Sequence, residues 1–267
     1  MTRRWLLAVV ATVATLLAAG PRRADAAGGV PSPRAETFTL RGRAQVLNVY
    51  GTRGGPAAIV TSGDGGWMHL GPDVARFLAG EGYFVVGFDA KAYLSAFTTG
   101  AGTLSVEDVP RDYAALVTYA AKDAPARPLL VGVSEGAGLS ILAATAPDVQ
   151  SRVAGVLALG LPDKNELGWR WRDSIIYLTK KTPNEPNFSA LEVVDRVSPV
   201  PLAALHSTHD EFVPLPEIER IMAQAREPKR LWVIEASNHR FSNNQAELQR
   251  RLKEAIAWTR SARSTER

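Results

Sequence analysis

The stretch Gly132-Val133-Ser134-Glu135-Gly136 decides how this sequence is interpreted. It follows an apolar run, Pro128-Leu129-Leu130-Val131, and it opens a segment of small and aliphatic residues at 137–144. A strand, a tight turn and a helix in this order are the setting in which Gly-x-Ser-x-Gly forms a nucleophile elbow. The turn strains the serine backbone and raises its hydroxyl above the sheet, at a helix N-terminus that favours a developing anion. Ser134 is therefore the candidate nucleophile.

The first 26 residues have the pattern of an export signal. Arg3 and Arg4 precede an uncharged apolar core at 5–19, and Ala24-Asp25-Ala26 fits the small-x-small cleavage pattern. The apolar core is shorter than the about 20 residues that a membrane-spanning helix needs. We expect cleavage after Ala26 and a periplasmic protein, exported by either the general secretory or the twin-arginine route.

The composition argues against several classes of function. The chain has no cysteine, which excludes disulfides, thiolate metal sites, a cysteine nucleophile and a lipid-anchored cysteine. The formal net charge of +4 includes four Arg and one Asp of the export signal, so removing their +3 leaves +1. A chain so close to neutrality has little electrostatic support for nucleic-acid binding. We expect no nucleic-acid partner, no metal and no cofactor.

After a polar linker at 27–35, apolar runs alternate with segments of helical period. Strands are predicted at 37–40, 45–50, 57–61, 83–88, 128–131, 153–159, 201–205 and 231–234. Helices are predicted around 70–78, 109–120, 218–225 and 248–256 and directly after the elbow. Continuous Val, Leu and Ile strands separated by helices favour a mostly parallel sheet with helices on both faces. We expect one α/β domain at 36–267, with its site beyond the carboxyl ends of the strands.

A serine nucleophile needs a base and an acid that orients the base. His239 directly follows the last predicted strand and is the candidate base. Asp210 follows the preceding strand and is the preferred acid, while Glu211 and Asp163 remain alternatives. The order Ser, Asp, His along the chain is the order found in α/β-hydrolases.

The loop Ser62-Gly63-Asp64-Gly65-Gly66-Trp67 follows the strand at 57–61. We expect an oxyanion hole made by the N–H of Glu135 together with the amides of Gly63, Asp64 and Gly65. The carboxyl groups of Asp64 and Glu135 would then lie near the acyl centre, where a negative charge opposes an oxyanion. Either they meet a cationic group of the substrate, or they point away and accept hydrogen bonds from the backbone.

Three segments resemble the VirJ/AcvB family of exported bacterial α/β-hydrolases: the glycine loop at 62–67, Asp73-Val74-Ala75, and Gly82-Tyr83-Phe84-Val85-Val86-Gly87-Phe88-Asp89. The likeness covers about residues 57–146. The resemblance implies an α/β-hydrolase fold and a periplasmic serine hydrolase. The AcvB branch is associated with removal of lysine from lysyl-phosphatidylglycerol, and the VirJ branch with type IV secretion and virulence. The chain departs from the family at Glu135, where an aromatic residue is common, and at 89–94.

An insertion at about 164–195 is long enough to form a small cap over the site. Tryptophans and cations mixed with aliphatic residues, as this segment has, suit a membrane interface or an anionic head group. The predicted substrate-binding residues are Asp64, Glu135, Trp67, Trp169, Arg170 and Trp171.

The predicted function is an exported serine hydrolase that cleaves a carboxylic ester. Its candidate substrates are small-molecule or lipid esters, among them the aminoacyl ester of an anionic phospholipid such as lysyl-phosphatidylglycerol. Peripheral membrane contact is a candidate interaction. The alternative is a catalytically silent hydrolase-fold binding module of an envelope or type IV secretion complex.

Overall fold

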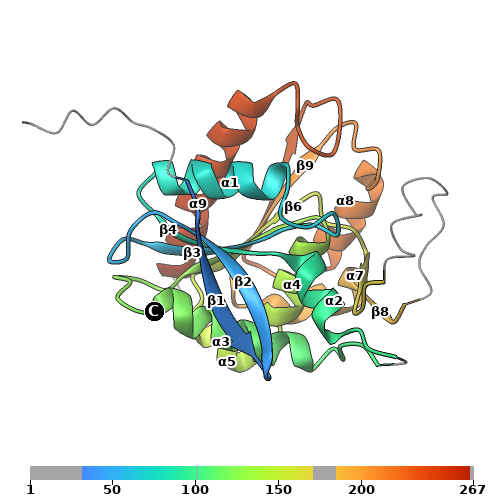
Figure 1. Ribbon diagram of the computed structural model, residues 1–267. Coiled ribbons are helices and arrows are strands. Elements are labelled where there is room, and N and C mark those ends of the chain that lie inside the picture. Colours follow the sequence, from blue (N-terminus) through green and yellow to red (C-terminus); the bar gives the residue numbers. More distant parts are fainter. Residues whose placement is uncertain (1–31, 101, 171–184, 265–267) are drawn as a thin grey trace, which may run out of the picture.

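The computed structural model describes residues 32–264, except 101 and 171–184 (Figure 1). The predicted export signal and Trp171 lie outside these residues. Eight strands form one sheet in the order β1-β2-β4-β3-β5-β6-β9-β10. Their bounds are β1 Arg34–Leu40, β2 Arg43–Tyr50, β3 Ala57–Thr61, β4 Phe84–Phe88, β5 Leu129–Val133, β6 Gly155–Leu159, β9 Leu202–Ser207 and β10 Lys229–Ile234. The first strand thus begins inside the predicted linker.

The sheet is mostly parallel, as predicted. β1 and β2 form an antiparallel hairpin, and β2 also pairs antiparallel with β4. All pairs from β4 through β3, β5, β6 and β9 to β10 are parallel. Every residue of β3, β5 and β6 is buried. Apart from Thr61, these strands consist of Ala, Val, Leu, Ile and Gly, because helices cover both of their faces.

Helices cover the two faces unequally (Figure 1). α1 (Leu70–Gly80) and α9 (Gln245–Ser264) pack on one face, around a core cluster that includes Val60, Val131 and Leu205. The other face carries α2 (Ala90–Phe97), α3 (Asp108–Ala121), α4 (Glu135–Ala144), α5 (Pro147–Arg152) and α8 (Leu215–Gln224). Within the described residues, no helix has both the length and the apolar character needed to cross a membrane.

The described ends of the predicted cap insertion form an ordered structure beside the sheet. β7 (Lys164–Glu166) and β8 (Asn187–Ser189) pair as a two-stranded antiparallel ribbon. α7 (Ala190–Val193) and η2 (Val194–Val197) then lead back to the sheet and pack in the main core. The sequence pattern does not predict α2, α5 or these short elements, because each is too short to show a clear helical or alternating period.

Candidate active site

Ser134 lies at a strained turn between β5 and α4, with φ 52° and ψ −120°. The close packing of α4 on the sheet explains both flanking glycines. A Cβ on Gly132 would overlap the backbone of Gly136 and Ala137, and a Cβ on Gly136 would overlap the carbonyl oxygen of Ser62. The turn therefore holds the backbone of Ser134 in a left-handed conformation that only tight local packing sustains.

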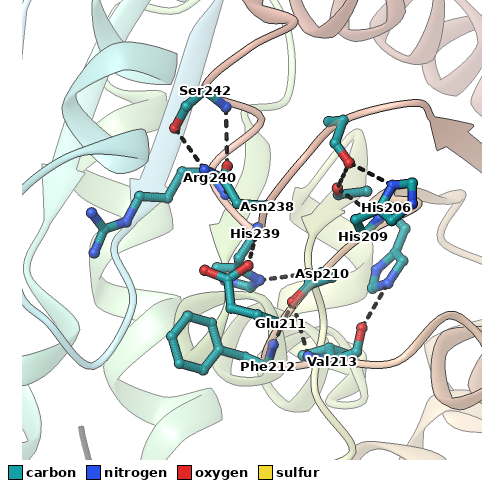
Figure 2. Close-up of polar contacts among 12 residues, drawn as sticks. His206, His209, Asp210, Glu211, Phe212, Val213, Asn238, His239, Arg240 and Ser242 are labelled. Carbon is teal, nitrogen blue, oxygen red and sulfur yellow. Dashed lines mark hydrogen bonds and ion pairs between the residues drawn. The ribbon is translucent and has the colours of Figure 1, made fainter.

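Asp210 and His239, which are 29 residues apart in the chain, meet beyond the carboxyl ends of β9 and β10 (Figure 2). His239 Nδ1 lies 2.6 Å from Asp210 Oδ2, and the side chain of Asp210 is fully buried. A carboxylate only accepts hydrogen bonds, so Nδ1 carries the hydrogen and Nε2 of a neutral ring is free to take a proton. This is the arrangement of an imidazole base with its orienting acid.

The turn after β9 holds the Asp210 carboxylate in place. Asp210 Oδ1 accepts hydrogen bonds from the N–H groups of Phe212 and Val213, each at 2.9 Å. Burial by itself would raise the pKa of Asp210. The hydrogen bond and charge of His239, together with the two backbone N–H groups, outweigh this and hold the pKa below its ordinary value. The carboxylate is therefore ionised at neutral pH.

Three neighbours fix the imidazole of His239. Glu211 Oε2 accepts a hydrogen bond from the backbone N–H of His239 at 2.7 Å, and the ring of Phe212 meets the imidazole edge-on. A Cβ on Gly160, which has φ +57°, would overlap the imidazole. His239 Nε2 is buried and has no hydrogen-bond partner among the described residues. His239 and Ser134 line the same cavity.

The three candidate acids have different surroundings. Asp210 contacts the imidazole ring, whereas Glu211 contacts only the backbone of His239. Asp163 directly precedes β7, and its Oδ1 accepts hydrogen bonds from the hydroxyl of Ser189 and the N–H of Leu191. Of the three carboxyl groups, the geometry of an orienting acid fits Asp210.

The glycine loop after β3 approaches the elbow closely. A Cβ on Gly63 would lie only 3.2 Å from Ser134 Cβ, so a side chain at this loop position would crowd the nucleophile. Gly63, Asp64 and Gly65 all line the cavity with Ser134 and Glu135. In the first turn of α4, the N–H of Ala137 donates to the carbonyl oxygen of Ser134, whereas the N–H of Glu135, at the first helical position, has no acceptor within the helix. The loop and the helix start therefore bring together the backbone segments that the sequence predicts for an oxyanion hole.

Two side chains attach this loop to the start of α2, and sequence reasoning gave neither of them a role. Asp89 Oδ2 accepts a hydrogen bond from the N–H of Trp67 at 3.1 Å, while its Oδ1 caps α2 through the N–H of Ala92. Ser62 Oγ accepts from the N–H of Ala90 and lies 3.2 Å from the carbonyl oxygen of Gly63. The signal for Asp89 was its place directly after a buried strand and before a helix, where Asp is a preferred N-cap.

The cavity has a volume of about 470 Å³ and is lined by two sets of residues. The sheet-end set comes from the elbow, the glycine loop, the start of α1 and the loops after β9 and β10. Its side chains include Met68, Leu70, Ser134, Phe212, Val213 and His239. The ribbon set comes from β7, β8 and their flanks, with one residue of α2. It comprises Lys91, Lys164, Glu166, Trp169, Glu185 and Asn187.

Glu135 is the buried carboxyl group between these two sets. It is 6% exposed, and its Oε1 accepts a hydrogen bond from the N–H of Glu166 at 2.7 Å. Burial, followed by the charges of Glu166 and Asp64, raises the pKa of Glu135 well above its ordinary value. The sequence left open whether this carboxyl would meet the substrate or hydrogen-bond to the backbone. It does the second, and it also lines the cavity.

The predicted aromatic and cationic substrate contacts fare unequally. Trp169 lines the cavity, with Lys91 Nζ 4.4 Å from its ring centroid. Arg170 is paired with Glu185 and is not among the lining residues described. The prediction that Trp67 binds substrate is wrong, because its ring packs against Gly87 and beside Tyr50 in the core instead of lining the cavity. Gly87 leaves room on β4 that the indole fills. Trp171 lies outside the described residues.

Comparison with known proteins shows a partial match to one family and identifies the fold. A family model described as bacterial virulence protein (VirJ) matches residues 56–175. No curated protein gave a significant match. Solved structures with a similar fold include a membrane phospholipase A described as a bacterial virulence factor, at TM-score 0.61 and 14% identity, covering 86% of this chain and 87% of that one.

Two esterases have the same fold. One, from Butyrivibrio proteoclasticus, has a TM-score of 0.60 and 15% identity, and the match covers 84% of this chain and 98% of the esterase. The other, from Pyrococcus furiosus, has a TM-score of 0.61 and 18% identity, with coverages of 85% and 91%. The predicted α/β-hydrolase fold is confirmed. The predicted resemblance to the VirJ family is likewise confirmed over residues 56–175 of the chain.

Proposed function

We propose that this protein is a serine hydrolase that cleaves carboxylic esters. The observation that carries the proposal is the 2.6 Å contact between Asp210 and His239, with His239 Nε2 unpartnered among the described residues and Ser134 at the elbow of the same cavity. Esterases and a phospholipase among the structures with this fold support an ester as the substrate.

In the proposed reaction, His239 Nε2 takes the proton of Ser134 as Oγ attacks the ester carbonyl carbon. The N–H of Glu135 and the amides of the glycine loop stabilise the oxyanion. When the tetrahedral intermediate collapses, the C–O bond to the alcohol breaks and His239 protonates the leaving oxygen. Water, deprotonated by His239, then attacks the acyl-enzyme and releases the acid, while Ser134 regains its proton.

For the substrate, we propose the aminoacyl ester of an anionic phospholipid. Asp64, Glu135 and Glu166 line the same cavity as Ser134, and burial, followed by the charges of the other two carboxyl groups, raises the pKa of Glu135. An ammonium group of the substrate would relieve their mutual repulsion. Lys91 and Lys164 line the same cavity and could meet a phosphate. Lysyl-phosphatidylglycerol has both kinds of charge.

The mouth of the cavity supports contact with a lipid surface. Met68 and Phe212 are 51% and 57% exposed, although both line the cavity. Exposed apolar side chains at the entrance of a site are typical of surfaces that meet lipid. We propose that the protein acts at the periplasmic face of a membrane, in keeping with the signal pattern at 1–26. Fractionation of cells and sequencing of the mature N-terminus test this location.

The central experiment offers purified protein a chromogenic short-chain ester and a fluorophosphonate probe, with Ser134→Ala as the control. Ester cleavage and covalent labelling are expected only with Ser134 present. An intact, folded protein that neither labels nor cleaves any ester would contradict the hydrolase and favour the silent binding module.

A second assay addresses the lipid. Vesicles that contain lysyl-phosphatidylglycerol are compared with vesicles of phosphatidylglycerol alone, and release of free lysine is measured. Cleavage of simple esters without release of lysine would contradict the proposed substrate and leave the hydrolase standing.

A further inference from the structure

A buried histidine that has no part in the proposed reaction contacts the loop that carries Asp210. His206 lies in β9, is 0% exposed, and places Nε2 3.0 Å from the carbonyl oxygen of Val213 (Figure 2). The N–H of the same Val213 donates to Asp210 Oδ1. One peptide unit on each side of Val213 therefore joins the imidazole of His206 to the carboxylate of the catalytic pair.

We propose that His206 is a positioning residue that sets the Asp210–His239 pair by anchoring the 210–213 turn to β9. The inference rests on the proposed function, since it assigns a further residue to that same site. His206 does not line the cavity and is not assigned contact with substrate. It acts through Val213 on Asp210, and through Asp210 on His239.

The tautomer of His206 follows from its contacts. A carbonyl oxygen can only accept, so Nε2 must carry the hydrogen and donate it to Val213. Nδ1 is then without a hydrogen, and it is buried with no hydrogen-bond partner among the described residues. An unpaired buried nitrogen costs free energy. The histidine is kept in spite of the cost of its unpaired Nδ1, and we infer that the hydrogen bond from Nε2 to Val213 is the reason.

Burial keeps the imidazole of His206 neutral. Burial lowers its pKa and outweighs the opposing effects of Asp210, the Val213 carbonyl and Glu217, while the nearby His239 lowers it further. A neutral ring donates one hydrogen bond without adding a positive charge beside Asp210. It therefore leaves the carboxylate free to stabilise the imidazolium of His239 during the reaction.

The decisive variants differ in whether they restore the donor. Glutamine places its amide N–H₂ near the position of Nε2, so His206→Gln keeps a donor for Val213, whereas His206→Leu removes it. We expect His206→Leu to lower kcat on a chromogenic ester about tenfold, the loss typical of one buried hydrogen bond, with KM within about twofold. His206→Gln should recover most of the rate.

The pH profile distinguishes positioning from mere stabilisation. A loosened Asp210 stabilises the imidazolium of His239 less well, so the acid limb of kcat/KM should move to lower pH in His206→Leu and return in His206→Gln. His209→Gln is the matched control, because His209 is exposed and contacts Thr208 and the carbonyl oxygen of Ala236 instead. Its rate and profile should match those of the wild type.

Nuclear magnetic resonance of ¹⁵N-labelled histidines tests the inference without any substrate. The wild type should show His206 as the neutral Nε2–H tautomer and a downfield proton from the His239–Asp210 hydrogen bond. That proton should shift or exchange faster in His206→Leu. A folded His206→Leu protein with unchanged kcat, pH profile and proton signal overturns the inference, as does a glutamine variant as impaired as leucine.

The two proposals fail in different ways. If the wild type cleaves no ester and takes up no fluorophosphonate, the proposed function fails, and the proton signal alone then decides whether His206 positions the pair. If the wild type is active and the His206 variants do not differ from it, the proposed hydrolase is supported and the positioning role is wrong.

Discussion

The two sets of residues that line the cavity differ in how their charges are satisfied. Behind the sheet-end set, the buried carboxylate of Asp210 receives hydrogen bonds from the imidazole of His239 and from two backbone amides. Next to the ribbon set, the buried Glu135 receives one backbone hydrogen bond and faces the charges of two other carboxyl groups. The first arrangement is complete without a ligand, whereas in the proposed function the second meets a cationic group of the substrate.

The difference separates chemistry from recognition. In the proposed reaction, the sheet-end set transfers a proton and holds the acyl group whatever the substrate, because its geometry depends on strands and tight turns. The ribbon set contributes charges of both signs and an aromatic ring to the same cavity. It is therefore the part that would distinguish one ester from another.

Removal of the nucleophile should break the sheet-end set completely. Ser134→Ala is expected to lower kcat by about 10⁴- to 10⁶-fold, the scale of such losses in serine hydrolases. Binding of substrate should be retained, since the cavity is unchanged. Single-turnover kinetics with a chromogenic ester measure the loss, and a residual rate above about one per cent of wild type would contradict the mechanism.

Removal of the acid tests the choice among the three carboxyl groups. Asp210→Asn should lower kcat by about 10³- to 10⁴-fold, because an amide can bind the ring in the wrong tautomer. Glu211→Gln keeps an oxygen for the backbone N–H of His239 and should cost far less. A larger loss in the Glu211 variant than in the Asp210 variant would reverse the assignment.

Gly160→Ala sharpens the comparison by moving the imidazole without altering its chemistry. The added methyl group overlaps the ring of His239, so we expect a fall in kcat of about 10²-fold. Gly42→Ala shares a positive φ but has open space around its Cβ, and it isolates the cost of backbone strain. Equal activity in the two variants would show that the contact with His239 does not matter.

Glu135→Gln probes the ribbon side and should have the smallest effect. The raised pKa of Glu135 means that the folded state favours its protonated form, so ionisation destabilises the protein as pH rises from the unfolded-state pKa through the folded one. The variant lacks this loss. At pH 8 its melting temperature should exceed that of the wild type by about 2–4 °C, which corresponds to roughly 1 kcal/mol, and below about pH 4 the two should agree.

The same variant bears on recognition. Its kcat/KM for a neutral ester should stay within about threefold of the wild type, whereas for a lysyl ester it should fall about tenfold as one charge partner is lost. Parallel rates on the two esters measure the ratio. An equal change on both would exclude Glu135 as a partner of the ammonium group.

Strand periodicity and motif order were enough to predict the sheet, the elbow and the two loops that carry Asp210 and His239. Apolar runs mark the buried strands, and the Gly-x-Ser-x-Gly motif and the residues directly after each strand mark the turns. Trp67 was misassigned because its ring packs in the space beside Gly87, and only the fold brings these two residues together. The pairing of the ribbon and the hydrogen bond between Asp89 and Trp67 depend on contacts between segments that are far apart in the chain. Local pattern carries no signal for them.

Because Gly132, Gly136 and Gly160 have no side chain, the molecule tolerates substitutions unequally in its two regions. Around the nucleophile and the imidazole, even a methyl group would collide with the backbone or the ring. The ribbon residues Lys164 and Asn187 are exposed and could change in size or charge without disturbing the sheet. Descendants of this protein that acquire new substrates would therefore diversify along the ribbon while the sheet edge stays fixed.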